Sequence, residues 1–328
     1  MIDTDIKRED FNDLQYCWLN LKDQLNWSSI FVLPNWMKVW WQEFGSGYEI
    51  LLGSIRQNEQ VIGIFPLKIK DSVATFIGSP DLCDYMDFIV APDKEDVFFT
   101  TILRDFNQFN IKEFQLGRCR PESTVMRYLL PMAEQLGYVV KSDQTDVSLE
   151  LELPQTWEDY LKVLSRKQRH EVRRKLRRLE EAGDVNYRCV QVVDELEDNL
   201  NVFLRLFSYS HEEKARFMTV RKESFFKSIT RSMAEIGLLH FGIVEFNQMI
   251  VAMIMLFNYS DTVYLYNSAY DPEFDSLSVG ILSKVLCLKQ SIESGRKKWD
   301  FLQGGEAYKY RIGGEEIPLY QCRIRLSD

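Results

Sequence analysis

Two stretches of the chain repeat the same order of apolar and polar segments about 190 residues apart. The first reads YEILLGSIRQNEQVIGIFPLKIKD (48–71) and the second LLHFGIVEFNQMIVAMIMLFNYSD (238–261). Each is an apolar strand, a short polar turn and another apolar strand, and Gly53 and Gly63 of the first align with Gly242 and Ala252 of the second. The pattern predicts two β-hairpins. A repeat of this length predicts two copies of one α/β domain.

Helical and alternating spacings of apolar residues predict a similar order of elements around both hairpins. In the first copy we expect helices 11–25, 34–44, 93–107 and 123–136 with strands 85–92 and 112–116 and two closing strands. In the second we expect helices 156–182, 194–210, 221–236 and 280–294 with strands 185–191, 262–270, 299–303 and 318–326. This order predicts an α/β (α+β) fold of two domains, 1–155 and 156–328. Each is expected to be a mixed, mostly antiparallel sheet flanked by helices.

Composition narrows the class of protein. The chain has 328 residues and is 45% apolar, enough for two hydrophobic cores. It has no run of 18 apolar residues that would predict a transmembrane segment. Its polar start does not resemble a secretory signal. Six scattered cysteines are typical of buried thiols in a reducing compartment, so we expect a cytoplasmic protein. Three dispersed histidines, with no Cys/His cluster, give no support to a metal site.

Basic charge is concentrated in one predicted helix, although the net charge of the chain is −9. The segment RKQRHEVRRKLRR (166–178) carries eight basic residues and one acidic residue. Leu164, Val172 and Leu179 form an apolar stripe beside a basic stripe that includes Arg169 and Arg173. This predicts an amphipathic helix that is buried on its apolar side. Its basic side is either a solvated face or attracts an anion: a nucleotide-sugar or lipid-linked acceptor, CoA phosphates, tRNA or an anionic membrane surface.

The order of elements resembles the GNAT superfamily of N-acyltransferases. Seen twice, it resembles the tandem form of Fem-type peptidyltransferases and of the GNAT-like family associated with bacterial cellulose and exopolysaccharide biosynthesis. This resemblance implies an acyltransferase whose second domain binds acyl-CoA. The first copy reads DKEDVFF (93–99) where a phosphate loop would lie. Because acidic residues there repel phosphate, we expect the first domain to bind no cofactor and to serve as a structural or substrate-binding half.

The second copy carries a strand, a turn and a helix in VYLYNSAYDPEFDSLSVGILSK (263–284). Free amides at the start of that helix predict an anion site. Its position resembles the pyrophosphate loop of acyl-CoA-binding GNAT domains. The resemblance implies that acetyl-CoA or another acyl-CoA is bound by Ala269, Tyr270, Ser278, Val279, Gly280, Ile281 and Lys284. Asp275 stands where that loop usually has a basic residue, and Ser276 and Ser278 stand where glycine is common. The alternative is an ordinary turn with Ser278 as N-cap.

The segment WDFLQGGEAYKYRIGG (299–314) resembles a run that follows the fifth strand in the tandem families. Acyl transfer to an amine needs a proton acceptor and stabilisation of an oxyanion. We therefore expect Glu306 to accept the proton, Tyr308 to donate to the leaving thiolate and Lys309 to stabilise the oxyanion or hold a substrate phosphate. A structural role for the segment is the alternative, with Lys309 and Arg311 paired to Glu315 and Glu316.

The expected acceptor is an amine on a small molecule, a nucleotide-sugar or a peptide. The residues that we expect to bind it are His211, Tyr266, Asp300, Arg311, Arg169 and Arg173. Two other hypotheses stay open. The donor could be an aminoacyl-tRNA, as in Fem-type enzymes. Alternatively, the chain could be a non-catalytic adaptor of envelope or polysaccharide assembly that uses the basic helix to reach an anionic membrane.

Overall fold

The computed structural model describes residues 4–191 and 195–326 and divides the chain into two compact units. Unit 1 comprises Met1–Val147 and Ile317–Asp328, and unit 2 comprises Ser148–Glu316. The expected domain boundary at residue 155 differs from this division in two ways. The last residues of the strand 139–152 already lie in unit 2, and the end of the chain belongs to unit 1. Asp194, where we expected a helix to begin, lies outside the described residues.

Unit 1 is a mixed sheet with helices. Its elements are β1 (Thr4–Arg8), α1 (Phe11–Leu21), α2 (Pro34–Phe44), β2 (Glu49–Gln57), β3 (Gln60–Lys70), β4 (Val73–Phe76), β5 (Ile89–Val90), α3 (Glu95–Asp105), β6 (Glu113–Cys119), a π-helical turn (Val125–Leu129), α4 (Leu130–Gln135), the first part of β7 (Val139–Glu152) and most of β13 (Glu315–Arg325). The strands follow the order β1-β2-β3-β4-β6-β13, and β5 pairs with β3. β4 and β6 are parallel, whereas β13 is antiparallel to β6. We expected two strands after α4, and the structure has the single strand β7.

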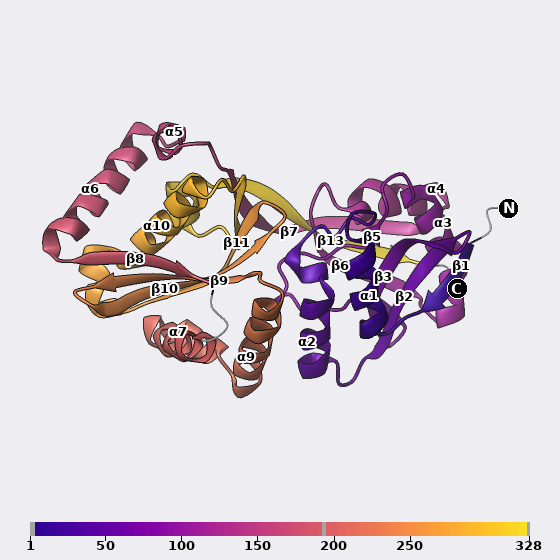
Figure 1. The fold of residues 1–328 in the computed structure, drawn as a ribbon. Helices are drawn as coiled ribbons and strands as arrows, with labels where there is room; N and C mark the ends of the chain where they lie inside the picture. The colour runs from indigo at the N-terminus through magenta and orange to yellow at the C-terminus, as the bar shows by residue number, and fades with distance from the viewer. Residues whose placement is uncertain (1–3, 192–194, 327–328) are drawn as a thin grey trace. The chain divides into compact units, whose positions relative to one another are not determined.

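Unit 2 repeats this plan. Its elements are the end of β7, α5 (Trp157–Val163), α6 (Arg166–Ala182), β8 (Val185–Val190), α7 (Leu196–Ser210), α8 (Glu212–Phe217), α9 (Val220–Glu235), β9 (Leu239–Phe246), β10 (Met249–Tyr259), β11 (Thr262–Tyr270), α10 (Val279–Glu293), β12 (Lys298–Gln303) and α11 (Ala307–Arg311). The strand order is β7-β12-β11-β10-β9-β8. Figure 1 shows α6 and α10 over one face of this sheet and α7 and α9 over the other. The prediction of two mixed, mostly antiparallel sheets is confirmed.

The two hairpins match in their turns. β2 and β3 are joined through Asn58 and Glu59, at φ 50° and 68°, and β9 and β10 through Asn247 and Gln248, at φ 48° and 66°. Two successive residues with positive φ form the turn whose twist suits a two-residue hairpin loop. Asparagine tolerates this region better than most residues. The turns lie at equivalent positions of the repeat.

A β-bulge is also repeated. The pairing of β2 with β3 skips Ile62, and the pairing of β9 with β10 skips Val251. The carbonyl oxygen freed by each bulge accepts a hydrogen bond from the residue that follows another strand paired with the bulged one, β5 beside β3 and β11 beside β10. Ala91 N donates to Ile62 O at 2.9 Å, and Asp271 N donates to Val251 O at 2.9 Å. The duplication predicted from the apolar pattern therefore extends to single hydrogen bonds.

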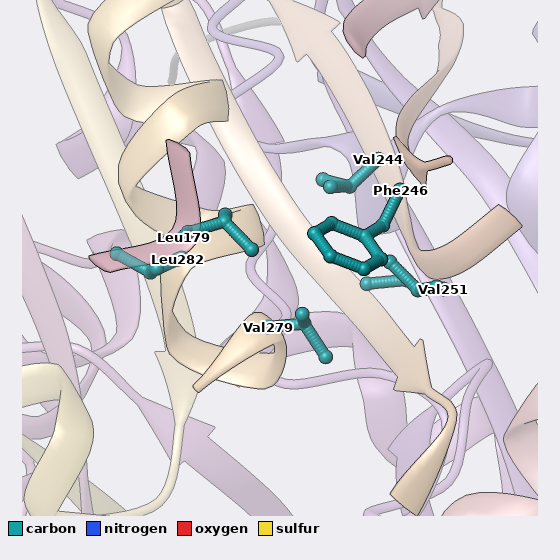
Figure 2. Packing of buried hydrophobic residues seen from close by; sticks show 7 residues of the cluster. Leu179, Val244, Phe246, Val251, Val279 and Leu282 are labelled. Carbon is teal, nitrogen blue, oxygen red and sulfur yellow. The ribbon is translucent and has the colours of Figure 1, made fainter. Parts of the chain in front are cut away.

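The helix that we expected over 156–182 is two helices. Leu164 is extended, and Ser165 begins α6 with a capping box: its hydroxyl accepts from Gln168 N, and the Gln168 side chain accepts from Ser165 N at 2.9 Å. The apolar stripe of α6 then packs on α10, β9 and β10 (Figure 2). The core there is formed by Leu179, Val244, Phe246, Val251, Ala252, Val279 and Leu282. This packing fixes α6 beside α10.

Candidate functional site

The two central strands of unit 2 separate at their carboxyl ends. β11 and β12 pair in parallel at three positions, from Thr262 with Lys298 to Tyr264 with Asp300. β12 then shifts its register against β7 between Asp300 and Leu302, and Leu302 takes a left-handed φ of 62°. The buried Asp300 carboxylate accepts from Leu302 N at 2.8 Å and so stabilises this bend. Beyond Tyr264, β11 continues without β12 beside it.

Side chains from α7 and α8 meet this part of β11. Ser210 Oγ accepts from Tyr270 N at 2.9 Å and lies 2.8 Å from Tyr270 O. Lys214 Nζ donates to the Ser268 carbonyl. Backbone groups that lack a neighbouring strand thus gain side-chain partners. We did not predict Ser210 or Lys214 as site residues. The polar run SHEEKARF that contains Lys214 was the available signal.

Two lysines in this region have strongly lowered pKa values. Burial lowers the pKa of Lys284 to about 7, and the neighbouring Lys214 ammonium lowers it further. Burial also lowers the pKa of Lys214 to about 8, while Glu306 acts in the opposite direction. A buried ammonium loses hydration, so its neutral form is favoured. Lys284 therefore titrates close to neutral pH, which is unusual for an amine and typical of functional sites.

Lys284, which we expected to bind a phosphate, turns its ammonium back toward a carbonyl of the first turn of α10. It is buried, donates to Gly280 O at 2.7 Å, and places Nζ 5.0 Å from the centre of the Tyr308 ring. Burial raises the pKa of Tyr308, and the charge of Glu306 raises it further. The Tyr308 hydroxyl makes no hydrogen bond within the described part of the chain. The buried amine of Lys284 thus lies beside the half-buried ring of Tyr308.

Lys309 holds the end of β12. Its buried ammonium donates to the carbonyls of Leu302, Gln303 and Gly304 at 3.1, 2.5 and 2.9 Å, and lies 2.9 Å from Glu306. We expected Lys309 to stabilise an oxyanion, but these partners already use its donors. The Glu306 side chain is more than half exposed.

An aromatic ring packs against the start of α10. A Cβ added to Gly280 would lie 2.9 Å from Cδ1 of Tyr270, so the tyrosine ring fills the space on the Cα side of this glycine. Ser278 is the N-cap residue of α10, as in our alternative, but it takes φ 60° and its side chain makes no capping hydrogen bond. Burial raises the pKa of Tyr270, and the charge of the exposed Asp275 raises it further. Val279 and Ala269 are buried. An anion at 278–281 would therefore meet an aromatic ring and a nearby carboxylate.

The remaining predicted residues lie at several places. His211 is exposed, with Nε2 3.5 Å from the Tyr270 hydroxyl. Tyr266 packs between Phe226 and Phe257, at centroid distances of 5.8 and 5.4 Å. The structure thus brings Tyr270, Lys284, Glu306, Tyr308 and Lys309 together with His211 nearby. Arg169 and Arg173 belong to α6. Ile281 and Arg311 line a groove beside that helix.

Within residues 4–191 and 195–326, no group of three or more His, Cys, Asp or Glu side chains is arranged to hold a metal ion. No helix in these ranges has the length and apolar character needed to cross a bilayer.

Comparison with known proteins identifies the fold. Residues 166–310 match the family model of the acetyltransferase (GNAT) domain. No curated protein matches the chain in sequence. The structure is similar to FemX, with a TM-score of 0.68, 12% identity, and coverage of 98% of this chain and 97% of that one. It is also similar to L-PGS from Bacillus licheniformis, with a TM-score of 0.53, 10% identity, and coverage of 89% of this chain and 91% of that one. For a tandem GNAT protein from the clavulanic acid biosynthesis pathway the TM-score is 0.52 and the identity 10%, with coverage of 99% of this chain and 100% of that one.

Residues 166–310 therefore form a domain of the acetyltransferase (GNAT) family, and the chain as a whole has the fold of tandem GNAT proteins. Its structural neighbours include the Fem-type protein FemX.

Proposed function

We propose that the chain is an acyltransferase that moves an acyl group to an amine, with its chemistry at Lys284 and Tyr308 in unit 2. The observation that carries this proposal is a buried lysine with a pKa of about 7, beside a tyrosine, where β11 and β12 separate. The GNAT match covers these residues. A base works best when its pKa lies close to the working pH, so we assign the base to Lys284 instead of Glu306.

The proposed reaction balances as follows. The acceptor amine attacks the acyl carbonyl carbon, a C–N bond forms, and the amine gives a proton to neutral Lys284. The bond from the carbonyl carbon to the leaving atom breaks, and that atom takes the Tyr308 proton. Because burial raises the pKa of Tyr308, this residue keeps its proton until the leaving group needs it. Proton return from Lys284 to Tyr308 restores both residues. Lys309 positions the end of β12, and the exposed Glu306 attracts the cationic form of the acceptor.

Two donors satisfy this chemistry. Acyl-CoA is the donor that the family resemblance implies, and CoA would reach the start of α10 only after Tyr270 moves from Gly280. An aminoacyl-tRNA is favoured by the ring of Tyr270 and the charge of Asp275, because neither leaves a ready phosphate site at 278–281. In both cases the expected acceptor is a small molecule, a nucleotide-sugar or a peptide, and the proposed location is the cytoplasm, where both donors are made.

Unit 1 would carry no donor. Its helix α3 corresponds to α10 and begins with Glu95 and Asp96 in its first turn. Carboxylates there suit the helix dipole but repel phosphate. We propose that unit 1 is a structural or acceptor-binding half.

Binding measurements separate the donors. The full chain and its Tyr270→Ala variant are each tested with two kinds of donor. Calorimetric titration measures binding of CoA and acetyl-CoA, and filter binding measures binding of aminoacyl-tRNA. If CoA is the donor, Tyr270→Ala should bind it more tightly because the α10 amides are uncovered. If tRNA is the donor, only charged tRNA should bind. Absence of binding in both assays would contradict the enzyme proposal and would favour a non-catalytic adaptor.

A further inference from the structure

A groove of about 480 Å³ lies between α6, the first half of α10 and the end of α11. Its volume falls within the range of small-molecule sites. The residues that line it are Ser165, Lys167, Gln168, Glu171, Val172, Lys175, Ile281, Leu282, Val285, Arg311 and Ile312. All of them belong to unit 2. None belongs to the Lys284 and Tyr308 pair.

The groove lies on a different face of α10 from the proposed catalytic residues. At 3.6 residues per turn, Ile281, Leu282 and Val285 share one side of the helix, whereas Gly280 and Lys284 point to another. Lys284 Nζ lies near the Tyr308 ring, and Ile281, Leu282 and Val285 face the groove. The groove is therefore a separate site.

The floor of the groove is apolar. Val172, Leu282, Val285 and Ile312 are buried, and Ile281 is half-buried. Lys175 has only 20% of its side chain exposed, so its methylene stem adds to the wall. Such a floor favours an alkyl or aromatic part of a ligand because burial removes apolar surface from water.

One end of the groove is cationic. The Gln168 side chain donates to Tyr310 O at 2.9 Å, and Tyr160 of α5 donates to Ile312 O at 3.0 Å, so α5 and the start of α6 are both tied to the end of α11. Lys167 and Arg311 belong to this end, and both are exposed. Neither makes an ion pair with the described residues. Our alternative pairing of Arg311 with Glu315 or Glu316 is not observed there. Glu171, the acidic residue of the lining, is paired with Arg174 at 2.7 Å and lies 3.8 Å from Lys175.

We infer that this groove binds an amphipathic phosphate ester. Its apolar part lies along Val172, Ile281 and Val285, and its phosphate lies between Lys167 and Arg311. Two cations match the double charge of a phosphate monoester, and a guanidinium binds phosphate oxygens in pairs. An uncharged amphiphile would leave both cations unused. The inference does not rest on the proposed acyl transfer.

Calorimetry on the full chain tests the site with three probes: octyl phosphate, octyl glucoside and inorganic phosphate. We expect octyl phosphate to bind with one-to-one stoichiometry, about tenfold or more tighter than either other probe, because only octyl phosphate uses both ends of the groove. Equal affinity for the two amphiphiles, or no binding of octyl phosphate, would overturn the inference.

Variants locate the binding. Arg311→Gln and Lys167→Gln should each weaken octyl phosphate about tenfold and leave octyl glucoside unchanged. The matched control Arg178→Gln changes an exposed arginine of α6 outside the groove and should bind like the wild type. Ile281→Trp should fill the groove and abolish binding of both amphiphiles. If its melting temperature shows that this variant is misfolded, Arg311→Gln and Lys167→Gln alone test whether the phosphate binds in the groove. Unchanged affinity in both charge variants would overturn the assignment.

A vesicle experiment distinguishes the source of the phosphate. Phosphatidylcholine vesicles with and without phosphatidic acid are sedimented with the protein. Retention that requires phosphatidic acid, and that Arg311→Gln but not Arg178→Gln abolishes, assigns the site to a lipid headgroup. Binding of octyl phosphate without retention on vesicles assigns it to a soluble phosphate ester. Retention lost equally in both variants would show a general attraction to the basic helix and would contradict a lipid in the groove.

Discussion

At the scale of single residues, unit 2 uses its buried lysines in two different ways. Lys309 satisfies three carbonyls at the end of β12 and pairs with Glu306, so its charge is compensated. Lys284 has one carbonyl partner, and its pKa falls to about 7. The number of hydrogen-bond partners therefore separates a lysine that holds structure from one that can exchange a proton.

The Lys284→Met variant should be more stable than the wild type at pH 7 and below. The folded-state pKa of about 7 lies below the ordinary 10.5, so the unfolded chain binds more protons between these values. The wild type therefore gains stability as the pH rises from about 7 towards 10, and the variant should lack that part of the slope. Urea unfolding at pH 7 and pH 9 measures this. Lys289→Met, which changes a half-buried lysine on the same helix, should keep the wild-type slope. A wild-type slope in Lys284→Met would contradict the assignment.

Activity should depend on pH through the same group. A general base must be deprotonated, so the rate should rise as the pH passes about 7 and then level off. Lys284→Met should lower kcat at least about a hundredfold with the donor that the binding experiments identify. A pH–rate profile checks the first expectation. The same rise in the variant would show that another group titrates.

The Tyr308→Phe variant separates chemistry from folding. The hydroxyl has no hydrogen-bond partner among the described residues, so its loss should leave stability nearly unchanged. The leaving group would lose its proton donor, and kcat should fall about ten- to a hundredfold while KM changes little. Steady-state kinetics and a melting curve on the same preparation measure both effects. A raised KM with unchanged kcat would indicate a binding role instead.

At the scale of elements, local patterns explain what could be predicted. Both hairpins and helix α2 follow from apolar spacing, and β11 has the bounds 262–270 that alternation indicates. The break before α6 was missed because apolar spacing continues through Leu161 and Leu164, although the capping sequence SRKQ was visible. The resemblance of segment 299–314 to the tandem families indicated Tyr308 and Glu306 as candidate site residues. We missed Ser210 and Lys214 although the polar run SHEEKARF contains both, because their contacts depend on how α7 and α8 pack against β11.

Two serines at helix starts should respond differently to substitution. Ser165 accepts from Gln168 N in a capping box, whereas Ser278 makes no capping bond with its side chain. Ser165→Ala should therefore cost about 1 kcal/mol, and Ser278→Ala should change the free energy of unfolding much less. Denaturant unfolding of both variants provides the comparison. Equal losses would show that the cap does not hold α6.

At the scale of the whole molecule, the units are not successive segments of the chain. β13 supplies unit 1 with a strand that pairs with β6, although all of unit 2 precedes it in sequence. A strand edge left open in this way tends to associate with other chains. The sequence repeat predicted two similar domains, but it could not show that one of them borrows a strand from beyond the other. The placement of β13 in unit 1 depends on strand pairing between segments that are distant in the sequence.

A fragment of residues 1–147 should therefore aggregate, and a fragment of residues 148–316 should stay in solution. Joining the β13 sequence to the first fragment through a flexible linker should restore its solubility, because the edge of β6 is paired again. Sedimentation and circular dichroism of the three fragments measure this. Equal solubility of the first fragment with and without the added strand would contradict a structural role for β13.

The placement of β13 also sets an order of events during synthesis. A ribosome that has made residues 1–147 must make the 169 residues of unit 2 before β13, the last strand of unit 1, is synthesised. The nascent amino-terminal half must stay unfinished through that interval, when chaperones can still bind it. A chain truncated before β13 would therefore lack a strand of unit 1, the half that was translated first, and that half would stay misfolded and open to degradation.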